Sequence, residues 1–326
     1  MTGVKILVAG DKSHAGKSTI SLGLLAALIE AGYQPSELAY IKPATQCVSS
    51  TLTARFCQSK GIAYKHIGPV VFYRGFTRDA LDRAVASPDE PSEQFPEICA
   101  EAVESISYGK RLTLIDGVGY PSVGSIIGCS SADIAIACRS PVLIVGRPGV
   151  GDAVDSFNLC AAVFESHRIP VLGAIFNKLQ PSGFYSRDKC ELHIRKYMAL
   201  HRPRQRVYGL LPLHSDLAGL AGEETCGFAY KHPPEPEEAG VMTLEDEGAV
   251  KVVAQLFKEH VDTRQLVADL IEASTNPAAW VRMRKAFPGT SAANTELGDN
   301  TPGTKRSRDD GLQLEKESAF DASMAK

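Results

Sequence analysis

The stretch GDKSHAGKST, residues 10–19, ends like a phosphate-binding loop but has an unusual spacing. The common pattern G-x-x-x-x-G-K-[ST] would place its first glycine at position 11, where this chain has Asp11, and Gly10 stands one residue earlier. The apolar run VKILVAG at 4–10 predicts a strand before the loop, and ISLGLLAALIEAG at 20–32 predicts a helix after it. A glycine-containing turn between a strand and a helix N-terminus presents free backbone amides and the positive end of the helix dipole to an anion. The setting therefore predicts a phosphate site despite the spacing.

Each position of the loop has an expected part in nucleotide binding. Gly16 lets the backbone approach the phosphates, Lys17 reaches the outer phosphates, and the hydroxyl of Ser18 is a ligand for Mg²⁺. The alternative is an incidental Gly-Lys-Ser sequence at a helix start, which needs no ligand. The residues predicted to surround the phosphates are Gly10, Ser13, His14, Ala15, Gly16, Lys17, Ser18 and Thr19.

Short β-branched runs alternate with segments of helical periodicity over about the first 210 residues. The predicted strands are 4–9, 38–41, 112–116, 142–146, 171–176 and 207–211, and the main predicted helices are 18–31, 97–107, 153–166 and 187–200. Buried, continuously apolar strands that alternate with helices are typical of parallel sheets with right-handed crossovers. The sequence predicts a doubly wound α/β domain, with a mainly parallel sheet and helices on both faces.

The chain changes character after this domain. We expect a nucleotide-binding domain at 1–225, a Pro- and Glu-rich linker or loop at 226–244, and a helical extension at 245–287. Two helices are predicted within the extension, around 245–260 and 263–273. The last segment, 288–326, lacks apolar periodicity and is rich in polar and charged residues, which predicts disorder.

The composition limits the classes of partner. The 326 residues are 44% hydrophobic and carry a net charge of -3, which suits a globular protein and gives no overall reason to bind nucleic acid or an anionic membrane. The eight cysteines form no C-x-x-C pair, so we expect reduced thiols in an intracellular protein. No apolar run approaches the roughly 20 residues of a membrane span and no leader is visible, so we expect a cytoplasmic protein.

The loop pattern resembles that of dethiobiotin synthetase and of cobyrinic acid a,c-diamide synthase, which also have five residues between the two glycines. Lys12 stands five residues before Lys17, where the related septum-site and partition ATPases carry an extra lysine. A second lysine aimed at the phosphates would spread charge stabilisation, but the sequence leaves the direction of Lys12 open. YIKPATQ at 40–46 is similar to the Lys-Pro motif of dethiobiotin synthetase. The resemblance implies a catalytic set of Lys17, Lys42 and Lys12, in which Lys42 helps to hold a carbamate and the phosphates.

LIDGVGYPSVG at 114–124 ends a predicted strand in an acidic residue followed by a glycine-rich turn, and it is similar to the Glu-Gly-x-Gly segment of the same group. The resemblance implies that Asp116 is a ligand of Mg²⁺, directly or through water, at the carboxyl end of a parallel strand. The alternative is an aspartate that caps its turn. Together with Ser18, Asp116 completes the predicted metal site.

IFNKLQP at 175–181 bears on the identity of the base. A guanine site would need N-K-x-D, and Gln180 stands in place of that aspartate. Asn177 instead resembles the adenine-contacting asparagine of the dethiobiotin synthetase group, and YGLLP at 208–212 is similar to the strand end that flanks the base there. The resemblance implies ATP, with Pro212 near the base and the stem of Lys178 packed along it.

One segment departs from dethiobiotin synthetase. CVSSTLTARFC at 47–57 contains no carboxylate where the synthetase has a magnesium-binding aspartate, and Thr51 or Thr53 could bind a metal only weakly or through water.

Two hypotheses about function follow. The first is an ATP- and Mg²⁺-dependent, ligase-like enzyme that activates a carboxylate or carbamate by phosphoryl transfer. The second is a nucleotide-switched binding or regulatory ATPase, and the resemblance implies a homodimer in both cases.

Overall fold

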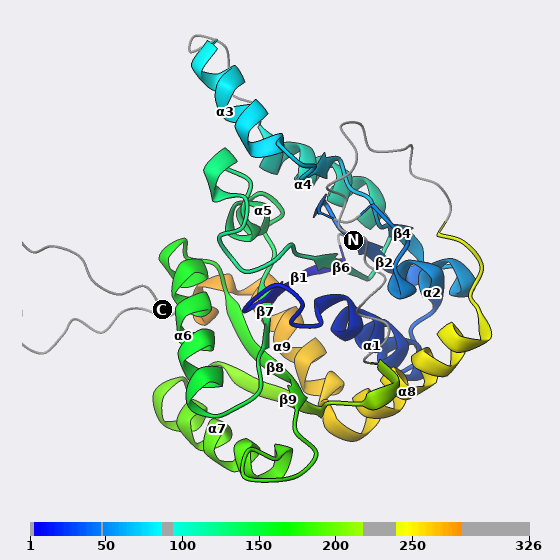
Figure 1. Ribbon diagram of the computed structural model, residues 1–326, viewed down its shortest axis with the longest axis vertical. Coiled ribbons are helices and arrows are strands. Elements are labelled where there is room, and N and C mark those ends of the chain that lie inside the picture. Colours follow the sequence, from blue (N-terminus) through cyan, green and yellow to red (C-terminus); the bar gives the residue numbers. More distant parts are fainter. Residues whose placement is uncertain (1–2, 47, 87–93, 218–238, 282–326) are drawn as a thin grey trace, which may run out of the picture. The chain divides into compact units, whose positions relative to one another are not determined.

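A parallel sheet forms the centre of the domain. The computed structural model describes residues 3–46, 48–86, 94–217 and 239–281, all within one compact unit. Seven strands pair in the order β4-β2-β6-β1-β7-β8-β9, and every pair is parallel (Figure 1). Their bounds are β1 Val4–Gly10, β2 Leu38–Ile41, β4 Ala63–Lys65, β6 Leu112–Asp116, β7 Val142–Gly146, β8 Val171–Leu179 and β9 Arg206–Pro212. The predicted doubly wound α/β class is confirmed.

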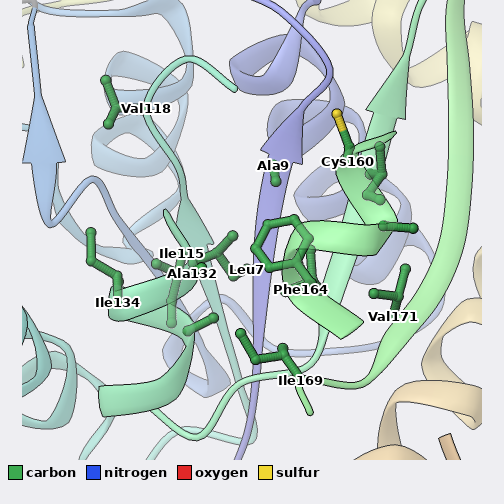
Figure 2. Close-up of a cluster of buried hydrophobic side chains, with 14 of the residues drawn as sticks. Leu7, Ala9, Ile115, Val118, Ala132, Ile134, Cys160, Phe164, Ile169 and Val171 are labelled. Carbon is green, nitrogen blue, oxygen red and sulfur yellow. The ribbon is translucent and has the colours of Figure 1, made fainter. Parts of the chain in front are cut away.

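Helices cover both faces of this sheet through two separate cores. One face packs against α4 Phe95–Ser107, α5 Ser131–Ala137, α6 Gly151–Ser166 and α7 Arg187–His201. The other packs against α1 Lys17–Glu30, α2 Leu52–Lys60, α8 Leu244–His260 and α9 Thr263–Thr275. Figure 2 shows the first core, where Leu7 of β1 and Ile115 of β6 lie beside Ala132 of α5 and Phe164 of α6. Continuously apolar strands are required here because both faces of the sheet are buried.

Several short elements were not expected. They are α2, α3 Phe76–Ala86, α5, β4 and a two-stranded sheet of β3 Ala44–Thr45 and β5 Val70–Val71. Their signals are local and polar: α2 begins where the Thr51 hydroxyl accepts a hydrogen bond from Ala54 N and ends at Gly61, which has a left-handed φ of 72°. Elements of two to eleven residues carry too little periodicity to be recognised from an apolar pattern alone.

The two C-terminal helices belong to the second core, as the position of α8 beside α1 in Figure 1 illustrates. Gly23 in the middle of α1 allows the close approach, because a Cβ atom there would lie 2.1 Å from the ring of Phe257 in α8. The helices predicted near 245–260 and 263–273 are therefore present. The predicted linker lies largely outside the described residues and the predicted tail wholly outside, so the proposed domain boundaries stay predictions. None of the helices in the described ranges is long and apolar enough to cross a membrane.

Candidate nucleotide-binding site

The predicted phosphate loop lies between β1 and α1 and opens into a cavity of about 780 Å³. Gly16 has a φ of 96°, and a Cβ atom there would lie 2.3 Å from Nδ2 of Asn177, so both backbone and space require glycine. Of the predicted loop residues, the cavity is lined by Ser13, His14, Gly16, Lys17, Ser18 and Thr19. Gly10 and Ala15 are buried beneath the loop, whereas Lys12 is exposed and does not line the cavity.

Asp11, which stands where the common loop pattern has its first glycine, is bonded to the turn that follows β7. Its Oδ2 accepts hydrogen bonds from the backbone N of Arg147 at 2.9 Å and from the Nε of Arg147 at 2.8 Å. The same pair raises the pKa of the Arg147 guanidinium. Gly10 serves as the first glycine, because a Cβ atom there would lie 2.9 Å from the carbonyl oxygen of Lys12. Sequence reasoning missed this tie between the loop and the turn that follows β7.

Asp116 lies behind the first turn of α1, at the end of β6, where Val8 of β1 is its register partner. Its Oδ2 accepts hydrogen bonds from Ser18 Oγ and from the hydroxyl of Tyr40, both at 2.8 Å. Its Oδ1 is buried and has no hydrogen-bond partner among the described residues. The partners of Oδ2 are side-chain hydroxyls, which differs from the turn-capping alternative, where backbone amides would donate.

The donor set at this position fits magnesium. A serine hydroxyl and a carboxylate with an unused oxygen are hard ligands of the kind that Mg²⁺ prefers. Within the described ranges no cluster of three or more His, Cys, Asp or Glu side chains could hold a metal ion. Mg²⁺ usually keeps waters and nucleotide phosphates as ligands and needs only one or two protein groups. Ser18 and Asp116 are the groups that would hold it here.

Lys42 brings a second cation to the same place from the end of β2. Its Nζ donates a hydrogen bond to Ser18 Oγ at 3.3 Å and lies 3.6 Å from Oδ2 of Asp116. Lys42 lines the cavity, although it is only 9% exposed. Burial, and next the charge of Lys42, lower the pKa of neighbouring His66. The lysine predicted from the Lys-Pro motif therefore lies at the end of the cavity that the predicted phosphate loop lines.

Asn177, Lys178 and Pro212 line the cavity as well, at the ends of β8 and β9. The side chain of Asn177 ties the loop in place, because its Nδ2 donates to the carbonyl of Ala15 at 3.0 Å and its Oδ1 accepts from Lys178 N at 2.9 Å. The Nζ of Lys178 donates to the carbonyl of His14 at 2.8 Å, so its ammonium group has a part beyond the expected packing of its stem. Burial, and next the charge of Lys12, lower the pKa of Lys178. Contact with adenine stays a prediction for all three residues.

Residues 4–220 match the family model described as the AAA domain, AAA_26. The chain belongs to this family. It is a P-loop NTPase of the AAA_26 group, which confirms the predicted relationship.

Sequence relatives of this AAA domain include cobyrinate a,c-diamide synthases of two archaea. The chain is 44% identical over 59 residues to the enzyme of Methanosarcina barkeri. It is 42% identical over 59 residues to that of Methanosarcina acetivorans. Each match spans 17% of this chain and only 11% of the synthase.

Solved structures similar to this AAA domain include two proteins of low sequence identity. The apo form of McdA from Cyanothece has a TM-score of 0.42 and 13% identity, covering 77% of this chain and 98% of McdA. The septum site-determining protein MinD from Pyrococcus horikoshii OT3, complexed with Mg-ADP, has a TM-score of 0.40 and 15% identity, covering 79% of this chain and 97% of MinD. Both TM-scores are low, so the fold assignment rests on the sheet itself.

The segment at 48–57, which contains no carboxylate, forms part of the cavity wall. The Thr53 hydroxyl donates to the carbonyl of Ser18 at 2.9 Å, and the Thr51 hydroxyl caps α2. Arg55 lines the cavity and forms a bidentate pair with Asp246 of α8, with Nε to Oδ2 at 2.9 Å and Nη2 to Oδ1 at 2.7 Å. Sequence reasoning missed the pair because its members lie 191 residues apart.

Proposed function

We propose that this AAA domain binds MgATP and transfers the γ-phosphoryl group to a carboxylate or carbamate of a second substrate. The observation that carries the proposal is the position of Lys42, whose Nζ lies 3.3 Å from Ser18 Oγ at the phosphate end of the cavity. A cation supplied by a neighbouring strand, in addition to Lys17 of the loop, suits a reaction that gathers negative charge on an acyl or carbamoyl phosphate.

The roles follow from the charges around the cavity. The amides near Gly16 and the ammonium of Lys17 would hold the phosphates, and Ser18 and Asp116 would hold magnesium. The bound metal ion would neutralise charge on the transferring group. Lys42 would then steady the oxygen atoms of the phosphorylated product. Catalysis of this kind depends mostly on positioning and electrostatics rather than on covalent participation of the protein.

ATP is the proposed nucleotide because Gln180 replaces the carboxylate that a guanine site needs. The proposed assembly is a homodimer, as the resemblance to dethiobiotin synthetase implies. The cobyrinate synthase relatives support activation of a carboxylate as the more general form of the chemistry, although the match spans only 11% of their length.

A second candidate function is a nucleotide-switched regulatory ATPase with no small-molecule substrate. It is favoured by the wall of the cavity at 48–57, where there is no carboxylate and where the Thr51 and Thr53 hydroxyls already serve a helix cap and the Ser18 carbonyl. In this case ATP alone would change the oligomeric state, and turnover would be slow.

The test is ADP formation by the purified protein with MgATP, with and without diaminopelargonic acid plus bicarbonate. The synthetase reaction predicts strong stimulation that disappears in Lys17→Ala and in Lys42→Met, whereas Lys60→Met, at the exposed end of α2, behaves as the wild type. Stimulation that survives Lys42→Met would contradict the proposed role of this lysine. If MgATP binds but nothing stimulates turnover, size-exclusion chromatography with and without ATP decides for or against the switch.

A further inference from the structure

Tyr40 is a buried residue of β2 that the proposed function leaves without a role. It is completely buried, and its ring packs in the core between the sheet and α1. Its register partner on β6 is Leu114, two residues before Asp116. The Tyr40 hydroxyl donates to Oδ2 of Asp116 at 2.8 Å. A hydroxyl buried at this depth costs free energy unless it is hydrogen-bonded, so this bond explains how a tyrosine is tolerated there.

Three groups meet at Oδ2 of Asp116, and they differ in what a ligand can do to them. Ser18 and Lys42 both line the cavity, where phosphates, magnesium and a second substrate would attract their polar ends. Tyr40 does not line the cavity, although its hydroxyl reaches the same oxygen. Ligands in the cavity would therefore draw on Ser18 and Lys42 but leave the bond from Tyr40 to Asp116 in place.

We propose that Tyr40 is a positioning residue of the magnesium site, which holds the Asp116 carboxylate through Oδ2 and so keeps Oδ1 available to the metal or its water. The inference rests on the proposed binding of MgATP. Without the hydroxyl, Asp116 is free to rotate and to compete for the Ser18 hydroxyl, which is itself a predicted metal ligand. Partners that orient metal ligands typically contribute roughly 10- to 100-fold to metal affinity.

The fold supplies a matched control at the far edge of the sheet. Tyr208 of β9 is 2% exposed, and its hydroxyl donates to Oδ2 of Asp269 at 2.8 Å. Asp269 has further partners in Arg206 and Gln265, so both of its oxygens are used. Tyr208→Phe therefore removes the same kind of buried bond as Tyr40→Phe, but far from the phosphate loop.

The experiment measures binding of a fluorescent ATP analogue to the full chain, first in EDTA and then during titration with MgCl₂. For Tyr40→Phe we expect analogue affinity in EDTA within about twofold of the wild type and a half-saturating Mg²⁺ concentration raised roughly tenfold. For Tyr208→Phe we expect both quantities to stay within about twofold. Equal Mg²⁺ requirements in Tyr40→Phe and the wild type overturn the inference. Failure of the wild type to bind the analogue in any condition overturns the proposed function instead.

A double variant shows whether Tyr40 acts through Asp116. Asp116→Asn should raise the Mg²⁺ requirement by itself, and adding Tyr40→Phe should raise it no further, because the carboxylate that Tyr40 orients is already gone. If the half-saturating Mg²⁺ concentration of the double variant rises by the product of the two single-variant effects, the inference is contradicted. Urea unfolding of each variant in the absence of nucleotide shows whether a raised Mg²⁺ requirement comes from the site or from poor folding.

Discussion

Two buried aspartates on different elements of the fold each accept a hydrogen bond from a buried tyrosine, but the rest of their surroundings differ. Tyr40 donates to Asp116 of β6 at 2.8 Å, and Tyr208 donates to Asp269 of α9 at 2.8 Å. Both oxygens of Asp269 are used, since Oδ2 also accepts from Arg206 Nε and Oδ1 accepts from Gln265 Nε2. Asp116 has an Oδ1 without a partner among the described residues. The saturated carboxylate holds α9 to β9, whereas the unsaturated one has capacity left for a ligand.

The same distinction extends to the rest of the chain that the structure describes. Four buried side-chain atoms there lack a hydrogen-bond partner, namely Asp11 Oδ1, Ser21 Oγ, Asp116 Oδ1 and His260 Nδ1. Two of them belong to the loop and to the proposed metal site, and Ser21 lies one turn after Ser18 on α1. A buried polar atom left unpaired costs about 1 to 3 kcal/mol, which a bound ligand would offset. Buried polar atoms without a hydrogen-bond partner therefore indicate the proposed nucleotide site better than burial of polar residues alone does.

Replacing each aspartate by asparagine, which exchanges one carboxylate oxygen for an NH2 group, tests the comparison between Asp116 and Asp269 most strongly. For Asp116→Asn we expect the affinity for MgATP to fall by at least about tenfold, because the metal loses an anionic partner or its orientation. The free energy of unfolding should fall by about 1 kcal/mol or less, because one oxygen was unpaired from the start and because Lys42, which loses its carboxylate partner, lines the cavity and can be solvated there. For Asp269→Asn we expect a loss of about 1 to 3 kcal/mol in stability and unchanged MgATP affinity. Urea unfolding and nucleotide titrations measure both quantities.

The result that contradicts the comparison is the reverse pattern. If Asp116→Asn unfolds as easily as Asp269→Asn and binds MgATP as the wild type does, the unused oxygen is a folding imperfection and not part of a site. Asp269→Asn also serves as the control for general damage to the sheet, because Asp269 is bonded to Arg206 and Tyr208 of β9, a strand that reaches the cavity only through Pro212 at its end.

Asp11 provides an intermediate case, since it has a charged partner and one unpaired oxygen. Arg147→Met would leave the Asp11 carboxylate buried without its cation, and we expect a loss of about 2 kcal/mol in unfolding free energy. The value lies below that of a fully buried pair because the Arg147 side chain is 33% exposed. Thermal or urea unfolding measures the loss.

Two further variants show whether this loss comes from the unpaired charge. The double variant Arg147→Met with Asp11→Asn should recover most of the stability, because an amide tolerates the site better than an isolated carboxylate. Arg74→Met, in an exposed turn, should leave stability unchanged. A double variant that is no more stable than Arg147→Met would contradict the explanation.

The positions of the loop and its neighbours could be predicted because the topology of a parallel sheet determines which residues lie close together. In a parallel sheet the carboxyl ends of neighbouring strands meet at one edge, so Lys42, Asp116, Asn177 and Pro212 were expected to converge once their strands were recognised. The central strands were recognisable because both faces of the sheet are buried and the runs are continuously apolar. Lys42, Asn177 and Pro212 line the cavity at this edge. Asp116 is completely buried and reaches the cavity through Ser18, and Lys12 is exposed and outside the cavity.

Pairs formed across long separations could not be predicted. Asp11 and Arg147 lie 136 residues apart, Tyr40 and Asp116 lie 76 apart, and Arg55 and Asp246 lie 191 apart. Nothing in the local pattern of a polar residue says which distant partner its side chain reaches, because that depends on how helices pack over the sheet. Asn177 illustrates the limit, since its place in the cavity was foreseen but its bond to the Ala15 carbonyl was not.

The smallest expected effect concerns Asp246, a saturated carboxylate that anchors α8 to Arg55. The pKa of Asp246 is lowered, mainly because its carboxylate accepts hydrogen bonds from Arg55, and burial only partly opposes this effect. A folded-state pKa below the unfolded value of about 3.9 stabilises the protein above that value, and the contribution is lost as the pH falls through the lower folded pKa. Asp246→Asn should therefore cost about 1 kcal/mol near neutral pH and progressively less as the pH falls below about 4.

Urea unfolding at a series of pH values measures this difference, with Asp216→Asn as the control because its side chain is 66% exposed and weakly paired. Acid unfolding should be less steep for Asp246→Asn than for the wild type, since one carboxylate that must be protonated is gone. MgATP affinity at neutral pH should stay within about twofold, because neither oxygen of Asp246 is unused. A large loss of MgATP affinity in this variant would contradict the distinction drawn from Asp116 and Asp269. It would show that a carboxylate with both oxygens hydrogen-bonded also contributes to nucleotide binding, through the Arg55 side chain that lines the cavity.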